Sequence, residues 1–360
     1  MPKFREKASV SAGAGWVGAM NDRFLKACRR EPTDCVPVWF MRQAGRYMKE
    51  YRAIRVKHSI LEVCKTPELA AQVTLQPIDR FPLDAAIIFA DILLPLEPMG
   101  AQLAFLADEG PVISNPVRDK AAVDALKTVQ PEALRFVYDA IRLARKALSG
   151  RVPLIGFAGA PFTLASYLIE GGSSRNFIET KRFMYHAPDA WHRLMDKLAR
   201  VITGYLKAQV EAGAQAVQLF DSWVGALSPD DYLEYVQPHV KVIFEGLKTT
   251  NVPCIHFGTG TATLLELMKQ AGGSVIGVDW RIRLDEARRR LGDDVAIQGN
   301  LDPVVLFAPL HEIERRVEAI LRQAGDRPGF IFNLGHGILP GTPIENVQAT
   351  IDLVHKLSSR

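Results

Sequence analysis

Short, nearly continuous apolar runs recur along the chain, and longer segments with apolar residues at helical spacing separate them. Strands that are buried on both faces of a parallel sheet have this pattern, because helices cover both faces of the sheet. The runs span residues 36–40, 85–90, 153–158, 216–220, 253–257, 274–279, 295–299 and 329–334. The pattern therefore predicts eight parallel strands.

Start and stop signals mark the helices between these runs. Residues 131–148 repeat apolar positions at helical spacing and stop before Gly150. Ser228 and Thr342 each precede a proline and an acidic residue, as expected at a helix start. Strands that alternate with helices predict an α/β protein with a (β/α)8 TIM barrel, whose active site lies at the C-terminal face of the strands. A doubly wound open sheet is the alternative, and the total length favours the barrel.

No internal repeat or low-complexity linker marks a second domain, so residues 21–360 are expected to form a single catalytic domain. Residues 1–20 are rich in Gly, Ala and Ser and are expected to be a poorly ordered N-terminal extension. Residues 13–18 match GxGxxG literally, but no strand precedes them, so we predict no dinucleotide loop there.

Composition and charge exclude several classes of protein. Hydrophobic residues make up 48% and charged residues 23% of the 360, which excludes a disordered or collagen-like chain. The net charge of +4 is too small to indicate a nucleic-acid partner. No segment has the ~18–20 unbroken apolar residues of a membrane span, and the N-terminus lacks the apolar core of a secretory signal. Four widely spaced cysteines without a CxxC pair suit reduced thiols, so we expect a cytoplasmic protein without a membrane partner.

Polar and small residues are concentrated where the apolar runs end. Because the C-terminal ends of barrel strands meet at one face, these residues are expected to share a pocket. They are residues 41–47, Asp91, residues 159–162, 221–223 and 256–260, and residues 335–337.

The residues after the first run are strongly basic. Arg42, Arg46, Arg52 and Arg55 fall within fourteen residues, and a solvated basic loop is the usual explanation of such a charge run. Arg42, however, directly follows a buried run, and the small residues after it let the backbone come close to a ligand. Because arginine binds carboxylates and phosphates in a bidentate manner, the pattern favours a site for an anionic small molecule.

Two further residues allow two interpretations each. Asp91 either caps the following helix or is held ionised near the arginines and acts on a cationic centre. His336 is either a structural histidine or, between its two glycines, a residue that approaches a ligand closely. The chain contains no HExxH, GxSxG or Walker motif, and we expect no metal site.

Several of these segments resemble a known family. The stretch PVWFMRQAGRY at residues 37–47 resembles the N-terminal signature of uroporphyrinogen decarboxylases. The similarity continues in IIFADIL (87–93), GFAGAPFTL (156–164), LFDSW (219–223) and NLGHGI (333–338), and it covers about residues 21–358. Met48 and Lys49 replace the family's usual Leu-Pro.

The resemblance implies a single-domain (β/α)8 barrel, usually a homodimer, that works without metal or organic cofactor. Such an enzyme removes carbon dioxide from the four acetate side chains of uroporphyrinogen III, an anionic tetrapyrrole, and forms coproporphyrinogen III in porphyrin and haem biosynthesis. By resemblance the catalytic residues are Asp91, Arg42, Tyr167 and His336. The implied substrate-binding residues are Arg42, Gln43, Ala44, Gly45, Arg46, Arg55, Asp91, Tyr167, Ser222 and His336.

The chemistry needs few protein groups. A pyrrole serves as its own electron sink, because protonation of a ring carbon gives a cation that the loss of carbon dioxide neutralises. Asp91 suits the anion that stabilises this cation. Arg42 suits either proton delivery through a water molecule or pairing with the reacting acetate.

Two other functions remain open from the sequence. A zinc-dependent corrinoid or thiol methyltransferase of the same superfamily would carry His-x-Cys after the fifth strand, where this chain has Gly258 two residues after His256. A non-catalytic tetrapyrrole-binding protein would have the same arginines.

Overall fold

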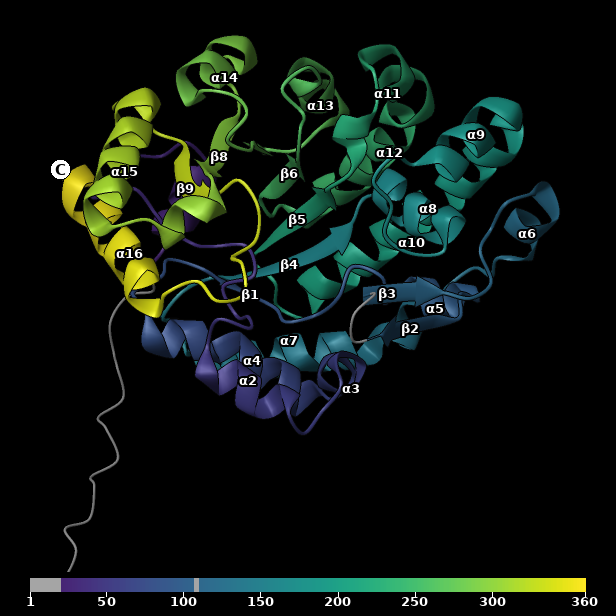
Figure 1. The fold of residues 1–360 in the computed structure, drawn as a ribbon, viewed down its shortest axis with the longest axis horizontal. Coiled ribbons are helices and arrows are strands. Elements are labelled where there is room, and N and C mark those ends of the chain that lie inside the picture. The colour runs from purple at the N-terminus through teal and green to yellow at the C-terminus, as the bar shows by residue number, and fades with distance from the viewer. Residues whose placement is uncertain (1–20, 107–109) are drawn as a thin grey trace, which may run out of the picture.

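The computed structural model describes residues 21–106 and 110–360, so the predicted extension at residues 1–20 lies outside the described residues. A curled parallel sheet forms its centre, and helices surround the sheet (Figure 1). The strand order is β1-β4-β5-β6-β7-β8-β9, so the strands of this sheet lie side by side in their order along the chain. These strands are β1 (Ala86–Ile87), β4 (Leu154–Gly159), β5 (Ala216–Asp221), β6 (Cys254–Gly258), β7 (Val275–Gly277), β8 (Ala296–Leu301) and β9 (Phe330–Leu334).

Seven of the eight predicted strands are therefore present, and the prediction of an α/β barrel of the TIM type is confirmed. Strands β4, β8 and β9 are buried along their whole length, as the continuous apolar runs indicated. The sequence analysis missed an antiparallel pair, β2 (Leu103–Leu106) and β3 (Gly110–Ile113), which lies outside the main sheet.

The first predicted strand, residues 36–40, is wrong as a strand, although it lies where a strand would close the ring. Val38 forms a single parallel bridge with Phe332 of β9, and on its other side its carbonyl accepts a hydrogen bond from the Asp84 N–H at 2.8 Å. Side chains form the other hydrogen bonds that main-chain strand pairing would supply on the β1 side. The Asp84 carboxylate accepts from the Val38 N–H at 2.7 Å, and Gln43 Nε2 donates to the Ala85 carbonyl at 3.1 Å.

Helices form the outer layer of the molecule (Figure 1). They are α1 (Arg23–Cys28), α2 (Lys49–Arg55), α3 (Ile60–Lys65), α4 (Pro67–Arg80), α5 (Leu96–Met99), α6 (Lys120–Ala125), α7 (Arg135–Leu148), α8 (Pro161–Glu170), α9 (Ile178–His186), α10 (Pro188–Glu211), α11 (Pro229–Tyr235), α12 (Gln237–Leu247), α13 (Leu265–Ala271), α14 (Leu284–Leu291), α15 (Leu310–Ala324) and α16 (Ile344–Ser358). None of the described helices is long and apolar enough to cross a membrane.

The helix-start signals are confirmed at one site and shifted at the other. Ser228 caps α11 by accepting from the Asp231 N–H at 3.1 Å. Pro343, rather than Thr342, is the cap residue of α16, because the Thr342 hydroxyl donates to the Leu339 carbonyl at 2.8 Å.

Side chains fill the interior of the barrel, so it is a packed core rather than a pore. Phe24 of α1 packs edge-to-face on Trp39 with ring centroids 6.4 Å apart. The Trp39 Nε1–H donates to Gln298 at 2.9 Å, and Gln298 donates to Gln218 at 3.1 Å. The floor of the barrel is thus closed, which leaves its other end for a site.

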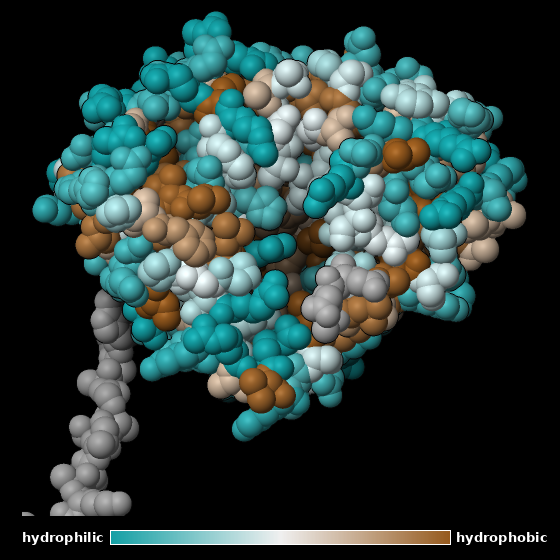
Figure 2. All heavy atoms as spheres, in the orientation of Figure 1, coloured by the Kyte–Doolittle hydropathy of each residue, from teal (hydrophilic) through white to brown (hydrophobic). Residues whose placement is uncertain are grey.

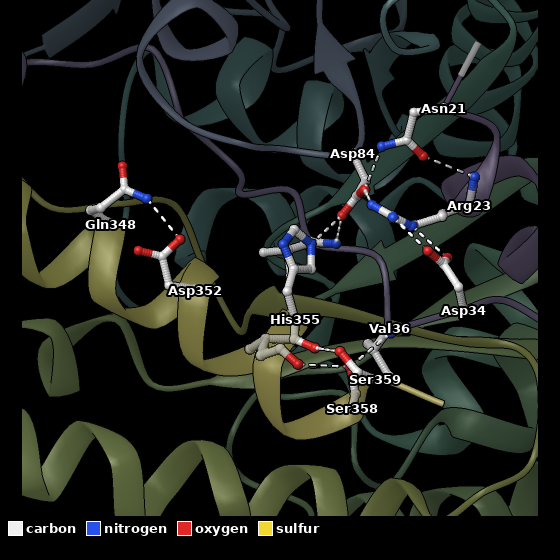
Figure 3. Close-up of polar contacts among 12 residues, drawn as sticks. Asn21, Arg23, Asp34, Val36, Asp84, Gln348, Asp352, His355, Ser358 and Ser359 are labelled. Carbon is white, nitrogen blue, oxygen red and sulfur yellow. Dashed lines mark hydrogen bonds and ion pairs between the residues drawn. The ribbon is translucent and has the colours of Figure 1, made fainter. Parts of the chain in front are cut away.

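A buried carboxylate joins the segments that close the ring (Figure 3). The Asp84 side chain is fully buried and accepts from the side chains of Asn21 and His355, each at 2.7 Å, and from Arg23 at 3.2 Å. With the Val38 N–H this makes four donors. Asp84 therefore ties α1, the ring-closing segment, the start of β1 and α16 together.

We expect Asp84→Ala to lower the free energy of unfolding by about 3–5 kcal/mol, because it removes the buried acceptor of the Asn21 amide, the His355 ring and the Val38 N–H, while Arg23 keeps its pair with Asp34. Urea unfolding followed by circular dichroism measures this effect. Asp352→Ala is the control, since Asp352 lies exposed on the same helix as His355 and, among the described residues, accepts a hydrogen bond from Gln348 alone. A loss below 1 kcal/mol for Asp84→Ala would contradict the proposed role of the junction.

Candidate active site

A cavity of about 230 Å³ opens at the C-terminal ends of the strands. Figure 2 shows a hollow near the centre of the molecule, with hydrophobic residues in its depth and hydrophilic residues around it. The loops after residues 36–40, β1, β5 and β9 and the start of α8 supply most of the lining. The lining residues are Met41, Arg42, Gln43, Ala44, residues 87–92, Phe157, Thr163, Tyr167, Phe220, Ser222, Trp223, Phe257, His336 and Gly337.

Aromatic rings form much of the cavity wall. Phe220 packs edge-to-face on both Phe157 and Phe257, with centroid distances of 5.5 and 5.8 Å. Phe89 lies on another side and packs against Tyr51 at 5.5 Å. The site is therefore suited to an apolar ring system, and charged groups within it act in a medium of low polarity.

Arg42 is held in an unusual backbone conformation beside Gly337. Its φ of 58° lies in the left-handed region. A Cβ on Gly337 would lie 2.6 Å from Arg42 Cγ and 3.0 Å from Arg42 Cβ, so only glycine leaves room for this side chain. The Ile338 N–H donates to the Met41 carbonyl at 2.9 Å and joins the two loops. The local structure thus fixes the Cβ and Cγ atoms of Arg42. The residue is exposed, so its guanidinium is available to bind a ligand.

Asp91 both forms a turn and lines the cavity, so the two interpretations of this residue are compatible. Its Oδ1 accepts from the Leu93 N–H at 2.9 Å. Burial raises the pKa of Asp91 above its ordinary value, while the Leu93 N–H and the positive charge of Arg42 oppose this rise. The structure therefore places an acid and a cation in one apolar cavity.

Tyr167 lies on α8 and packs against Trp223 with the rings tilted by 33° and their centroids 4.0 Å apart. Burial raises the pKa of Tyr167 to about 12, and the negative charge of Asp91 adds to the effect. The hydroxyl consequently keeps its proton at neutral pH and is available as a hydrogen-bond donor. Ser222 lies beside Trp223 in the lining, and its carbonyl accepts a short hydrogen bond from the Thr259 hydroxyl.

His336 is neutral in this setting. Burial and the positive charge of Arg42 lower its pKa to about 4, although Asp279 acts in the opposite direction. The Gly337 N–H donates to His336 Nδ1 at 2.8 Å. This hydrogen bond assigns the proton to Nε2, so the ring offers a neutral N–H donor to the cavity.

Some predicted residues lie outside the cavity lining. Gly45 and the exposed Arg46 follow Ala44 on the same loop but do not line the cavity. Arg55 donates to the Tyr51 hydroxyl and to the His58 carbonyl, each at 3.2 Å, so it lies behind the lining. Arg52 holds the loop in shape by donating to the Arg46 and Tyr47 carbonyls at 2.9 Å.

Gln43 lines the cavity, but backbone groups occupy its side-chain amide. Its Oε1 accepts from the Phe40 N–H at 3.1 Å, and its Nε2 donates to the Ala85 carbonyl. The amide therefore holds the ring-closing segment against β1, which leaves the backbone of this loop for a ligand.

The sequence analysis missed most of the aromatic wall and the lining residue Thr163, whereas Trp223 and Phe257 lie in segments that it placed in the pocket. Trp223 stands in the LFDSW segment directly after β5, and its place at a strand end was the available signal. Thr163 donates to Asp221 at 3.0 Å, and burial raises the pKa of this fully buried acid to about 7.

The described residues contain no group of three or more His, Cys, Asp or Glu side chains that could hold a metal ion. His256, which stands at the histidine position of the His-x-Cys motif of the rival function, is fully buried with its Nδ1 at 3.3 Å from the Met268 carbonyl. Burial lowers its pKa to about 4. The absence of a metal or organic cofactor stays a prediction.

The fold and the cavity define a TIM-type barrel enzyme with an apolar, charge-bearing site at the ends of its strands. A solved methyltransferase from Methanosarcina mazei has the same fold, with a TM-score of 0.80 over 94% of this chain and 99% of its own; at 21% identity this likeness shows the fold alone. A sequence profile described as uroporphyrinogen decarboxylase (URO-D) matches residues 19–357.

Two curated relatives extend this finding, and both are uroporphyrinogen decarboxylases. The one from Sorangium cellulosum (strain So ce56) is 62% identical over 94% of this chain and 97% of its own length. The one from Carboxydothermus hydrogenoformans is 60% identical over the same shares. The chain therefore belongs to the uroporphyrinogen decarboxylase family. The predicted resemblance and the function of a carboxy-lyase of porphyrin and haem biosynthesis are confirmed.

Proposed function

We propose that this chain removes carbon dioxide from the four acetate side chains of uroporphyrinogen III and forms coproporphyrinogen III without metal or organic cofactor. One observation carries the assignment of roles: Asp91 and Arg42 share an apolar cavity at the C-terminal face of the barrel. The acid suits the cationic centre of a protonated tetrapyrrole, and the guanidinium suits its anionic periphery.

Each decarboxylation begins with the addition of a proton to a pyrrole carbon, which creates a cation. The electron pair of the bond to the carboxylate then flows into the ring and neutralises the cation, and carbon dioxide leaves. A second proton converts the resulting exocyclic methylene group into a methyl group, and the ring carbon loses its added proton. One proton is consumed for each acetate.

Asp91 stabilises the cation in this scheme. Its carboxylate accepts hydrogen bonds from the pyrrole N–H groups, and these bonds favour the ionised form against the effect of burial. A fixed charge in a site of low polarity lowers the barrier because it needs no reorganisation during the reaction.

Arg42 binds the reacting acetate or delivers the proton through an ordered water molecule. Tyr167 and His336 supply neutral donors to the other substrate carboxylates, and Ser222 completes this side of the pocket. Arg46 and the backbone of residues 43–45 bind carboxylates that extend beyond the cavity, and Arg55 acts from behind the lining through the Tyr51 hydroxyl.

The direct test is anaerobic incubation with uroporphyrinogen III, followed by oxidation and chromatography of the porphyrins. We expect the four-carboxylate porphyrin to accumulate. Unchanged eight-carboxylate porphyrin would favour a tetrapyrrole-binding protein without catalysis. Stoichiometric zinc in the purified protein would favour the methyltransferase instead.

We expect His336→Asn to reduce kcat/KM by about 5–10-fold, the contribution of a single neutral hydrogen bond. With a pKa of about 4, His336 is neutral from pH 5 to 8, so the wild-type pH profile is expected to show no histidine limb near 6.5. Steady-state kinetics between pH 5 and 8 measure both effects. A variant as inactive as Asp91→Asn would assign His336 a larger role.

We also propose that the enzyme is a homodimer. The residues Val304 and Phe307 of η4 (Pro303–Phe307) and Leu310 at the start of α15 are 59, 46 and 55% exposed, and such apolar groups favour contact with another protein surface. Sedimentation equilibrium is expected to give twice the 39.9 kDa of one chain. A mass of one chain at micromolar concentration would refute the dimer.

A cytoplasmic location is part of the same proposal. All four cysteines are free thiols, as suits a reducing compartment. Cell fractionation is expected to recover the protein with cytoplasmic markers, and recovery with the membrane or secreted fraction would contradict it.

A further inference from the structure

The substrate carries more carboxylates than the cavity lining has cations to bind them. Arg42 is the only lysine or arginine among the described residues that line it. Uroporphyrinogen carries four propionates besides its four acetates, and these propionates remain through the whole reaction. Their carboxylates extend from the edge of the macrocycle, so cations that lie around the mouth of the cavity are the natural partners.

The loop after β7 meets the cavity beside His336. A Cβ on Gly335 would lie 2.6 Å from Trp280 Cε3, so Trp280 packs directly on the backbone that precedes His336. This contact places Asp279, Trp280 and Arg281 at the β9 side of the site, in a region that neither motif nor resemblance indicated.

Arg281 is held firmly but only partly covered. Its guanidinium lies 4.5 Å above the Trp280 ring and forms an ion pair with the buried Asp279. Asp279 is fixed in turn, because it accepts from the Gly260 N–H at 2.7 Å and the Arg281 N–H at 3.0 Å. The Arg281 side chain is nevertheless 52% exposed, and the Asp279 pair engages only its Nη1 among the hydrogen bonds of the described residues.

The electrostatics agree with this placement. Besides burial, the positive charges of Arg42 and Arg281 lower the pKa of His336, and the negative charge of Asp279 opposes them. A side chain of the cavity lining therefore experiences both cations, although Arg281 comes from a different strand end.

We propose that Arg281 is a cation of the cavity rim that binds a propionate carboxylate of the substrate through the exposed part of its guanidinium. This inference rests on the proposed function. Asp279 and Trp280 pre-organise the guanidinium, so binding costs little side-chain entropy. Because the propionates do not react, Arg281 contributes equally to substrate and transition-state binding and thus affects KM rather than kcat.

The test compares Arg281→Ala with Arg283→Ala. Arg283 is an arginine two residues further along the chain, 68% exposed and paired with Asp285 at the start of α14. We expect Arg281→Ala to raise KM for uroporphyrinogen by about 5–10-fold with kcat within twofold, the effect of a partly exposed charged hydrogen bond. Arg283→Ala is expected to leave both constants unchanged.

A second variant separates binding from support of Asp279. Arg281→Gln removes the charge but keeps a donor for Asp279, so it tests the proposal even where Arg281→Ala fails to fold. We expect the same rise in KM, with a melting temperature close to that of the wild type. An unchanged KM in folded Arg281→Gln, or an equal rise in Arg283→Ala, would overturn the role of Arg281. Loss of coproporphyrinogen formation by the wild-type protein would instead refute the proposed function.

Discussion

Asp91→Asn is expected to lower kcat by about 10²–10³-fold with the fold intact, which corresponds to roughly 3–4 kcal/mol of barrier. Asparagine has nearly the same shape, and its carbonyl oxygen still accepts from the Leu93 N–H. The variant therefore removes the negative charge that we propose stabilises the protonated tetrapyrrole, and little else. Steady-state kinetics with uroporphyrinogen, alongside circular dichroism, measure the effect.

Asp302 provides a matched control for Asp91. Its Oδ1 accepts from the Val304 N–H at 2.9 Å, the same two-residue turn that Asp91 forms with Leu93, but Asp302 does not line the cavity. We expect Asp302→Asn to leave kcat within twofold. Equal losses in the two variants would show that the turn, rather than the charge, matters.

The pH dependence follows from the same carboxylate. Burial raises the pKa of Asp91 above its ordinary value of 3.8, so the free enzyme loses the negative charge earlier as the pH falls. The acid limb of the kcat/KM profile is thus expected at a pH above 3.8, and activity is lost as the pH falls through this limb. The limb reports the free enzyme, in which no pyrrole N–H groups stabilise the carboxylate.

Arg42→Ala is expected to abolish turnover, with a loss of at least about 10³-fold in kcat/KM. The substitution removes the only cation of the described lining, which in the proposed mechanism pairs with the reacting acetate or delivers the proton. It also removes the charge that opposes the raised pKa of Asp91, so less of that acid is ionised. Single-turnover decarboxylation measures the loss without the influence of product release.

Two further variants make the Arg42 result interpretable. Alanine is strained at a φ of 58°, so Arg42→Gly tests the same loss without that strain. Lys49→Ala removes an exposed cation of the same basic segment, at the start of α2, and is expected to leave turnover within twofold. Near-native turnover of Arg42→Gly would remove this arginine from the mechanism.

The apolar runs predicted the sheet because strands buried on both faces carry the signal locally. The run at residues 36–40 carries it equally well, yet it forms a single bridge. On the β1 side, the side chains of Asp84 and Gln43 form hydrogen bonds that main-chain pairing would otherwise supply. Such contacts between residues far apart in the sequence leave no local pattern. The β2–β3 pair was missed because each strand has only four residues and is partly exposed, so the apolar residues of β2 are too few to stand out as a buried run.

We predicted that residues at the ends of the strands share a pocket, because consecutive parallel strands end at the same face. Arg42, Asp91, Ser222 and His336 do line one cavity. Tyr167 lies on α8, away from a strand end, and only the resemblance indicated it. Most of the aromatic wall was not predicted, since a phenylalanine within a strand looks the same whether it faces the core or a cavity. The sequence could not show that Arg42 lines the cavity, that Arg52 holds the loop and that Arg55 lies behind the lining. The directions of these side chains depend on the fold of the loop.

The most direct test is a crystal structure of the enzyme with coproporphyrinogen, grown without oxygen. We predict that the pyrrole nitrogens converge on the Asp91 carboxylate at hydrogen-bond distances of about 2.7–3.2 Å, with Arg42 at a carboxylate of the macrocycle edge. A macrocycle bound with Asp91 outside the reach of its nitrogens, or with Arg42 directed into solvent, would contradict the pairing of a central anion with a cationic rim.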